Sequence, residues 1–520
     1  MRVLAGIFPA ALIAMVAVVL PSPDRHDAQG SGARRPAPAK PPVVILVLDE
    51  FPADDIVGPG GRIDGARFPN FAALAATSSW FPNATSVYDS TFKAVPAILD
   101  ARLPVRGSAP DTRSHRRNAF TLFDRLGYGV VDIESGTAVC PRSVCRGAHA
   151  RRPGVLQRLN RGGRPGRLAR WIRQIRPRAR PTLYFQHALL PHEPWLYLPS
   201  GRQSRPAGND PVEGINKPIG FHDRDLTLHN HQRHLLQAGF VDRELGRLLD
   251  RLRRTGLMSR ALIAVTADHG YSFEVGVRDR RKVTETNIDE IAPVPMFIKA
   301  PRQRRGDVNP SYVRTVDLLP TLAGMLGAKL SWRHHGRSVF GRAARRRHSV
   351  AMVTRDFSRT VRIDARRLEQ RRQANRERSA RLFGTGFESS VRFGSPWAQL
   401  YRAGPASTLI GQPARAARRP AAGAARIANA ALLRRVDPAS RLFPTRLTGT
   451  LSGGPEGIRR ELAAVVDGRI VAAGRSFHLR GDETEFFSLM LPEESLHAGR
   501  NRVQLIEIGR NGSRYLLAES

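Results

Sequence analysis

Two runs of apolar residues organise the hydrophobic pattern of this chain. Residues 43–48 read VVILVL and residues 261–265 read ALIAV, and neither alternates between apolar and polar positions. Such runs are typical of parallel strands that are covered on both faces. Each run is followed closely by charged side chains. Because open α/β sheets bind ligands at the carboxyl ends of their strands, the pattern predicts a site where these two strands end.

Strand-like and helix-like segments alternate over the first two thirds of the chain. Further strands are expected at residues 130–133, 183–186 and 294–298, and helices at residues 68–76, 95–101, 120–126, 241–252 and 316–326. Residues 201–234 are polar and dotted with histidines, which indicates a loop. The alternation predicts an α/β sandwich with a mostly parallel central sheet over residues 42–345.

The pattern changes after residue 345. Residues 346–440 are rich in arginine and alanine, which predicts a linker with surface helices. Residues 441–520 consist of short alternating segments separated by turns such as Asp467-Gly468 and Asn511-Gly512. We therefore expect a small C-terminal β-rich domain built as a β-sandwich.

The amino terminus has the layout of an export signal. Arg2 precedes an almost unbroken apolar run over residues 3–20, and the polar, proline-rich residues 21–41 follow as a linker. Residues 1–20 fit either a signal sequence or one membrane anchor, so we expect an extracytoplasmic protein that is secreted or membrane-anchored. In such a compartment the two cysteines, Cys140 and Cys145, predict a disulfide that closes a small loop.

The chain is strongly basic. It has 83 Lys and Arg against 45 Asp and Glu, a formal net charge of +38. This balance fits nucleic acid, an anionic envelope or merely an arginine-rich proteome. The basic residues are spread along the whole chain, with no zinc-finger spacing and no aromatic-interleaved module. We therefore expect no nucleic-acid partner. The excess charge is best explained by an arginine-rich composition, with the attraction of acidic substrates as a side benefit.

Side chains from three segments combine into a candidate metal site. Asp49 follows the first apolar run, Thr91 stands at a helix start, and Asp268 and His269 follow the second run. A hard divalent cation prefers carboxylate oxygens and tolerates an imidazole. A hydroxyl held against such a cation becomes a nucleophile because its pKa falls. Taken alone, Thr91 also fits an ordinary helix N-cap.

These residues resemble the sulfatase and alkaline-phosphatase superfamily, in its sulfatase-like branch with a threonine nucleophile. ILVLDE resembles the first metal-binding strand, TADHG resembles the second metal motif, and TVDLLPTLAGMLG at residues 315–327 is similar to a helix near the end of the sulfatase domain. The resemblance covers residues 43–345 and implies the alkaline-phosphatase-like fold. It also implies one bound divalent metal ion, which would be Mn, Zn, Mg or Ca. The ligands would be Asp49, Thr91, Asp268 and His269, with Glu50 as a weaker ligand.

The nucleophile segment departs from that of true sulfatases. STFKAVPAILDARLP at residues 90–104 resembles their Cys-x-Pro-x-Arg segment, and the alignment places Thr91 at the modified cysteine. Threonine cannot be converted to formylglycine, and Lys93 and Val95 replace the Pro and Arg of the modification signal. The resemblance therefore implies the chemistry of phosphodiesterase, phosphoglycerol-transferase and phosphoethanolamine-transferase relatives.

The segment LLPHEPW supplies a second candidate catalytic residue. It resembles the His-x-Pro-aromatic segment that faces the substrate in lipoteichoic-acid-synthase-like enzymes. His192 would therefore bind phosphate or protonate the leaving group, or it would simply pack on Trp195.

Other polar residues are weaker candidates. His187, Arg102 and Lys282 are candidates for contact with an anionic substrate, as is Arg278. Asp225 and His229 have the Asp-x-x-x-His spacing of a second metal site in two-zinc relatives.

Taken together, the residues and the family resemblance indicate an exported, metal-dependent enzyme that hydrolyses or transfers a phosphorus ester of an anionic envelope lipid or glycopolymer. Thr91 would form a phosphothreonine-type intermediate, which water or an acceptor alcohol would resolve. Two alternatives remain: an atypical sulfuric-ester hydrolase without formylglycine, and a catalytically inert anchored protein that binds glycopolymer. The presence of all four site residues argues against the inert protein.

Overall fold

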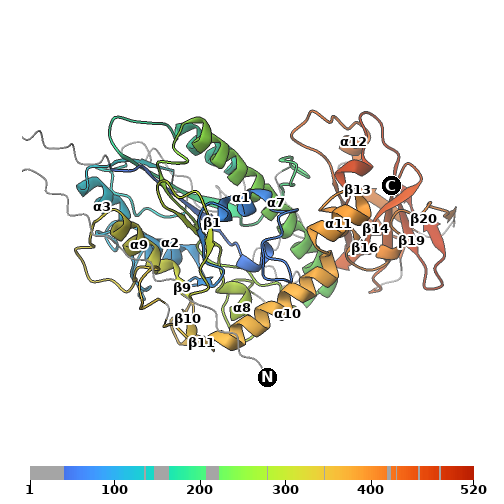
Figure 1. The fold of residues 1–520 in the computed structure, drawn as a ribbon. Helices are drawn as coiled ribbons and strands as arrows, with labels where there is room; N and C mark the ends of the chain where they lie inside the picture. Colours follow the sequence, from blue (N-terminus) through green and yellow to red (C-terminus); the bar gives the residue numbers. More distant parts are fainter. Residues whose placement is uncertain are drawn as a thin grey trace, which may run out of the picture. The chain divides into compact units, whose positions relative to one another are not determined.

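The computed structural model (Figure 1) describes residues 40–133, 136–145, 163–206, 222–277, 279–344, 346–418, 423–428, 430–454, 457–479 and 482–519. The predicted signal or anchor at residues 1–20 and nearly all of the predicted linker at residues 21–41 lie outside these ranges. Within the ranges, no helix combines the length and the apolar character that crossing a membrane requires.

The main sheet has the strand order β4-β5-β1-β6-β7-β2-β8. Its strands are β1 (Val43–Asp49), β2 (Ser79–Trp80), β4 (Gly129–Asp132), β5 (Thr182–Pro191), β6 (Leu262–Ala267), β7 (Met296–Lys299) and β8 (Asp307–Val308). The first four in spatial order run parallel, whereas β7 is antiparallel to both of its neighbours. The prediction of a mostly parallel central sheet is therefore confirmed. The two apolar runs form adjacent strands, with Val43 of β1 opposite Leu262 of β6.

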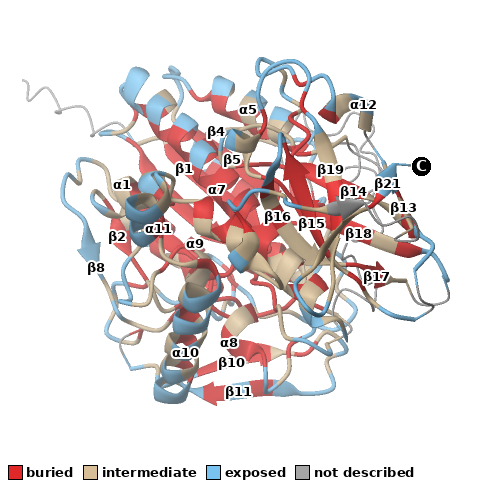
Figure 2. Cartoon of the chain, turned by 90° about the vertical axis from the view of Figure 1, so that its right-hand side faces the viewer, coloured by how far each residue is buried: buried red, intermediate tan, exposed pale blue. Residues whose placement is uncertain are grey.

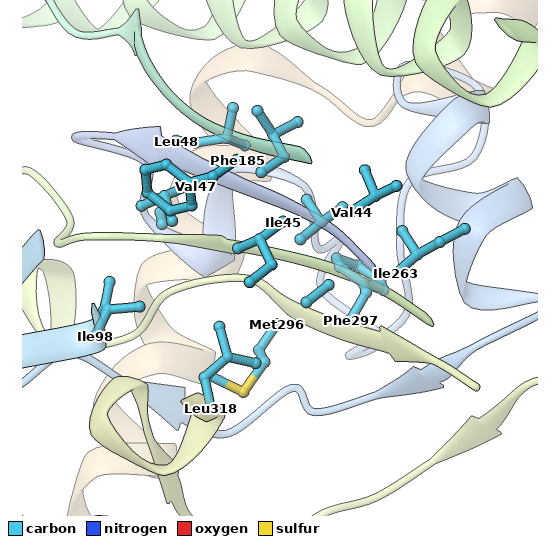
Figure 3. Close-up of a cluster of buried hydrophobic side chains, with 14 of the residues drawn as sticks. Val44, Ile45, Val47, Leu48, Ile98, Phe185, Ile263, Met296, Phe297 and Leu318 are labelled. Carbon is cyan, nitrogen blue, oxygen red and sulfur yellow. The ribbon is translucent and has the colours of Figure 1, made fainter. Parts of the chain in front are cut away.

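Helices cover this sheet and bury every residue of β1, β5 and β6. They are α1 (Pro69–Ala75), α2 (Thr91–Asp100), α3 (Ala119–Arg125), α5 (Arg164–Gln174), α7 (Arg224–Arg254), α8 (Ile288–Ile291) and α9 (Leu318–Met325). Helix α7 contacts α1, α5 and β5, whereas α2 contacts α3 and α9. Figure 3 shows Ile98 of α2 and Leu318 of α9 on one side of the strands and Ile263 of β6 among the buried core residues.

Helix α7 corrects the prediction of a loop over residues 201–234. It begins at Arg224, where the Asp223 side chain accepts a hydrogen bond from the Leu226 amide at 2.9 Å and caps the helix. The first turns are polar because some of their side chains bond to the C-terminal part of the chain, as His229 does to Ser488. An apolar stripe is therefore missing where helix pattern analysis looks for one.

The predicted linker at residues 346–440 contains regular structure. It includes the hairpin β10 (Ser349–Val353) and β11 (Thr360–Asp364), followed by α10 (Ala365–Phe383) and α11 (Gly386–Phe393). Figure 2 shows that α10 exposes one side to solvent. The opposite side includes the buried residues Leu368, Arg372 and Arg376.

Strands β3 (Ala84–Thr85) and β9 (Val313–Arg314) form a further parallel pair.

The C-terminal part contains two five-stranded sheets with a hydrophobic cluster of their own. One sheet consists of β12 (Ala417–Arg418), β15 (Glu461–Val466), β16 (Arg469–Arg475), β19 (Val503–Ile508) and β20 (Arg514–Leu516). The other consists of β13 (Ala424–Ile427), β14 (Arg446–Ser452), β17 (Phe477–His478), β18 (Glu485–Met490) and β21 (Ala518–Glu519), and α12 (Ala430–Leu433) lies between β13 and β14 in sequence. Strands β12 and β13 fall within the predicted linker, so that segment contributes to both sheets.

Candidate active site

The two central strands bring two carboxylates together at their carboxyl ends. Asp49 is the last residue of β1, and Asp268 directly follows β6. The Asp268 amide donates to the Leu48 carbonyl at 2.9 Å, and the Glu50 amide donates to Asp268 Oδ1 at 3.2 Å. Both carboxylates are almost completely buried. The two strand ends therefore lie side by side, as the sequence predicts.

Thr91 lies between these carboxylates. Its hydroxyl donates to Asp268 Oδ2 at 2.7 Å, and Asp49 Oδ1 is 3.2 Å away. Thr91 is the first residue of α2, and the N-cap position belongs to Ser90, whose backbone is extended. The interpretation of Thr91 as an N-cap is therefore wrong, because its side chain faces the acidic pair. With 9% of its surface exposed, Thr91 keeps limited access to solvent.

Two histidines complete the cluster. His269 Nδ1 donates to the Gly270 carbonyl at 2.9 Å, which leaves Nε2 as the ring nitrogen available to a metal. That Nε2 atom is 3.6 Å from Asp268 Oδ2. His187 on β5 approaches from the other side, with Nε2 3.9 Å from Asp49 Oδ2 and 3.8 Å from Asp268 Oδ2. The structure places His187 beside the acidic pair, and the contact with substrate expected of it stays a prediction.

The donor set fits a divalent cation. Ligand atoms of Asp49, His187 and Asp268 lie within 4.8 Å of one another, and all three residues are buried. Burial raises the pKa of Asp49 well above its usual value, and the facing Asp268 carboxylate raises it further. The buried Nε2 of His269 has no hydrogen-bond partner in the described chain. Two facing carboxylates and a spare imidazole nitrogen are what a bound cation would satisfy.

Gly270 is required here for space. Its φ is not positive, so the backbone conformation does not demand glycine. A Cβ atom at this position would lie 2.3 Å from the Glu290 carbonyl oxygen. Gly136 is similar, because a Cβ there would lie 3.0 Å from Thr91 Cγ2 and 3.1 Å from the His187 ring. Gly136 thus lets main chain pack against Thr91 and His187, whereas Gly270 lets the chain after His269 pack against the main chain of Glu290.

Glu50 belongs to a second polar layer. Its backbone is left-handed, with φ 59°, and its carboxylate accepts hydrogen bonds from buried Arg280 at 3.1 and 3.3 Å. Burial opposes ionisation of Glu50, but Arg280, His192 and Arg281 outweigh it and lower the pKa of the carboxyl. Because Arg280 holds the carboxylate, Glu50 is less available to a metal than Asp49 is.

His192 lies in the same layer. Nδ1 bonds to the Glu193 carbonyl at 2.7 Å and Nε2 is 3.3 Å from Glu50 Oε1. Burial lowers the pKa of His192 to about 3, although Glu50 opposes the shift. Ligand atoms of Asp49, Glu50 and His192 form another group within 4.8 Å. The catalytic role expected of His192 stays a prediction.

The contacts that basic residues were predicted to make with an anionic substrate stay a prediction. Arg102 and Lys282 are exposed, and in the described chain no ion pair or hydrogen bond joins their side chains to the acidic cluster. Arg278 lies outside the described residues. The cations next to the site are Arg280, which also pairs with Glu193 at 3.0 Å, and Arg281, whose Nε is 3.6 Å from Glu50 Oε1. The arginine-rich sequence around them offers no signal that separates these two from their neighbours.

Arg164 was also missed. It is the first residue of α5, is buried, and donates to the carbonyls of Leu189, Glu193 and Pro194 at 3.0, 3.3 and 2.5 Å and to that of His192. One guanidinium thereby satisfies a run of buried carbonyl oxygens in the segment that carries His192. In sequence, Arg164 is one arginine in a segment full of them.

The remaining predictions lie away from this centre. Asp225 is 3.4 Å from Arg459 and 3.3 Å from Arg475, and His229 Nε2 is 2.9 Å from Ser488 Oγ. These partners belong to the C-terminal part, so the Asp-x-x-x-His spacing serves a packing contact in this structure. The predicted disulfide between Cys140 and Cys145 is confirmed.

Parts of this chain are similar to known proteins. A family model described as Sulfatase matches residues 41–328. A sulfatase of Formosa agariphila is 26% identical over 173 residues, which are 29% of this chain and 33% of that protein. The N-acetylgalactosamine-6-sulfatase of Homo sapiens is 34% identical over 98 residues, which are 19% of this chain and 18% of that protein. The chain thus matches a third or less of the length of these curated relatives.

Solved structures that are similar to this chain include a phosphonate monoester hydrolase from Silicibacter pomeroyi. It has a TM-score of 0.42 and 19% sequence identity, with 60% of this chain and 79% of that chain covered.

Proposed function

The chain belongs to the sulfatase family, and we propose that it hydrolyses or transfers an anionic phosphorus ester with Thr91 as the nucleophile. The observation that carries this proposal is the position of the Thr91 hydroxyl, 2.7 Å from Asp268 Oδ2 and 3.2 Å from Asp49 Oδ1. A threonine that merely began a helix would have no reason to lie between two buried carboxylates. A nucleophile needs a proton acceptor at this distance.

One divalent ion would be held by Asp49, Thr91, Asp268, His187 and His269. Mn, Zn and Mg suit these oxygen and imidazole donors, and Ca is a further choice. When bound, such an ion lowers the pKa of a neighbouring hydroxyl and neutralises the charge of an anionic ester. The finding that Asp49 and Asp268 face each other in a buried site supports a cation between them.

The reaction would proceed by double displacement. The Thr91 oxygen attacks phosphorus while its proton passes to Asp268 Oδ2, and the bond from phosphorus to the leaving oxygen breaks. The leaving alkoxide takes a proton from solvent. A water or an acceptor alcohol then attacks the phosphothreonine, loses its proton to solvent, and releases the Thr91 oxygen, which recovers its proton from Asp268.

The surroundings of Thr91 suit an anionic ester. Thr91 begins the ten-residue helix α2, whose N-terminal end carries partial positive charge. The Arg281 side chain, 19% exposed and 3.6 Å from Glu50, is a cation next to the acidic layer that solvent reaches. Together these groups would offset the charge of the ester as it approaches two carboxylates.

The choice of phosphorus over sulfur rests on the nucleophile. Formylglycine is made from a cysteine or serine side chain, whereas threonine carries a methyl group that blocks the conversion. A threonine alcohol can still attack phosphorus directly. The curated relatives named as sulfatases favour the second candidate, an atypical sulfuric-ester hydrolase, and that reaction would use the same Thr91 attack.

The natural substrate we propose is an anionic lipid or glycopolymer of the cell envelope. The export layout of residues 1–20 and the net charge of +38 support an extracytoplasmic protein that meets acidic polymers. The C-terminal sheets would orient the catalytic part on such a polymer or simply pack against it. An inert glycopolymer-binding protein is the alternative without catalysis.

Turnover of two chromogenic esters by the full-length protein with Mn²⁺ separates these functions. A phosphodiester should be hydrolysed and a sulfate ester should not. Turnover of the sulfate alone would establish the second candidate. If neither ester reacts, Mn²⁺ binding decides the outcome: a protein that binds no metal is the inert binding protein, and one that binds metal is a strict transferase or needs a different leaving group.

A further inference from the structure

The segment that the sequence predicted as a linker contacts the loops that carry the site. Strand β10 lies beside the residues that precede Thr91, with Val353 bridged in parallel to Tyr88. The Tyr88 hydroxyl donates to the Arg355 carbonyl at 2.8 Å, and the Val353 amide reaches the Val87 carbonyl at 3.5 Å. The hairpin β10–β11 thus flanks the start of the nucleophile segment, although it lies beyond the family match that ends at residue 328.

Arg355, in the turn of this hairpin, contacts two loops of the site. Its Nη2 donates to the Asp89 carbonyl at 3.3 Å, its Nε is 3.6 Å from Asp89 Oδ1, and its Nη1 pairs with Asp279. Asp89 is completely buried and stands two residues before Thr91. Asp279 directly precedes Arg280 and Arg281, the cations beside Glu50. One guanidinium therefore links the nucleophile segment to the loop that neutralises Glu50.

Helix α10 holds the loop that follows β1 in the same manner. Buried Arg372 donates to both oxygens of Asp54 at 2.9 Å, and Arg376 adds a bond to Asp54 Oδ1 at 3.0 Å. Asp54 lies in η1 (Ala53–Asp55), a few residues after Asp49. The bidentate geometry fixes the angle as well as the distance of this loop.

We infer that Arg355 and Arg372 are positioning residues of the active site, so that the functional unit extends through α10. Arg355 would hold Thr91 in line for attack, and Arg372 would hold Asp49 and Glu50 where the cation is bound. This inference rests on the proposed function, because it assigns these arginines a role in turnover and metal binding. Misplacement of a nucleophile by a fraction of an ångström lowers the turnover rate, whereas displacement of the loop that carries the ligands weakens metal binding.

The chain supplies a matched control. Arg359 follows Arg355 in the same turn and pairs with Glu285, and both side chains of that pair are more than half exposed. Loss of this pair removes an arginine and an ion pair from the same hairpin without touching Asp89, Asp279 or Asp54.

The test compares Arg355→Ala, Arg372→Ala and Arg359→Ala with the wild-type full-length protein. We expect Arg355→Ala to lower kcat about 10- to 100-fold per folded molecule while the Mn²⁺ Kd changes less than about threefold. We expect Arg372→Ala to raise the Mn²⁺ Kd, measured by calorimetry, about 10-fold or more. Arg359→Ala should match the wild type in both measurements.

Thermal unfolding without metal measures the purely structural share of each change. If an alanine variant does not fold, Arg355→Lys and Arg372→Lys replace it, because lysine keeps the charge but cannot bond to two partners in the same geometry. Wild-type kcat and Kd in both folded variants, with only a lower Tm, would overturn the inference and leave the proposed function intact. A wild-type protein without turnover and without Mn²⁺ binding would instead remove the proposed function and this inference with it.

Discussion

The aspartate–histidine pair Asp268 and His269 differs from the pair Asp225 and His229 in what surrounds it. Asp268 and His269 follow a buried central strand and meet Asp49, Thr91 and His187, which come from other parts of the sequence. Asp225 and His229 lie one turn apart on α7 and contact partly exposed arginines and a serine of the C-terminal part.

The difference shows that convergence of separate segments marks this site better than spacing within one segment. A pair at i and i+4 on a helix needs only one helical turn to come together. Two strand ends, a helix start and a third strand meet only if the sheet order is β5-β1-β6. The first cluster is buried, and local folding alone does not bring its residues together. Asp225, in contrast, forms ordinary surface ion pairs with Arg459 and Arg475.

The largest expected effect comes from removing the hydroxyl at the buried cluster. Thr91→Ala should lower kcat for a chromogenic phosphodiester on the order of 10³-fold or more, because no other group replaces the nucleophile. Thr91→Ser keeps a hydroxyl and should retain a substantial part of the activity. Equal activity of Thr91→Ala and wild type would show that Thr91 only fills space at the start of α2.

The next effect separates the two aspartate–histidine pairs through metal binding. Asp268→Asn removes a carboxylate charge from the cluster and should weaken Mn²⁺ binding about 100-fold or more, measured by calorimetry. His229→Gln on α7 is the matched control and should leave the Kd unchanged. An equal loss in both variants would mean that α7 carries a metal site as well.

A third aspartate, Asp242 on the buried half of α7, gives a pH-dependent effect on stability. Burial raises the pKa of Asp242 to about 6, although the Phe71 and Asn70 amides bond to it. The folded protein therefore keeps a proton that the unfolded chain releases near pH 4, so stability falls as the pH rises from about 4 to 6.

The shift of about two pKa units corresponds to a loss of about 3 kcal/mol at most in the free energy of unfolding. Asp242→Asn removes the titrating group, so denaturant unfolding of that variant should show a flatter profile between pH 4 and 6. Identical profiles for the variant and the wild type would place the pKa of Asp242 near that of an exposed aspartate.

The smallest effect is expected at the surface pair. Asp225→Asn removes partly exposed ion pairs with Arg459 and Arg475, and should change the free energy of unfolding by less than about 1 kcal/mol. Turnover and metal affinity should not change. A marked loss of turnover would contradict the contrast between the two pairs and would connect the C-terminal contact to the site.

The sequence was sufficient for the centre of the fold because β1 and β6 are apolar on both faces and end in carboxylates. That pattern predicts neighbouring strands, and neighbouring strands bring Asp49 and Asp268 together. His187 was given a different role because its place depends on β5 lying next to β1, and pattern analysis does not give strand order.

The arginines that hold the site were beyond sequence reasoning. Arg164, Arg280, Arg355 and Arg372 stand in arginine-rich stretches, where local composition cannot distinguish a buried guanidinium from a solvated one. The same ambiguity made residues 346–440 resemble a linker, although α10 buries Arg372 against Asp54. Long-range ion pairs are set by tertiary packing and leave no periodic signal.

The most direct measurement is covalent trapping at Thr91. The full-length protein with Mn²⁺ would be mixed with a reactive phosphoester, quenched in acid within milliseconds to seconds, and digested for mass spectrometry of the peptide that carries Thr91. The account predicts a phosphoryl adduct on Thr91 that forms and decays with turnover and is absent from Thr91→Ala. Continued turnover by Thr91→Ala, with the adduct on another residue or on none, would contradict it.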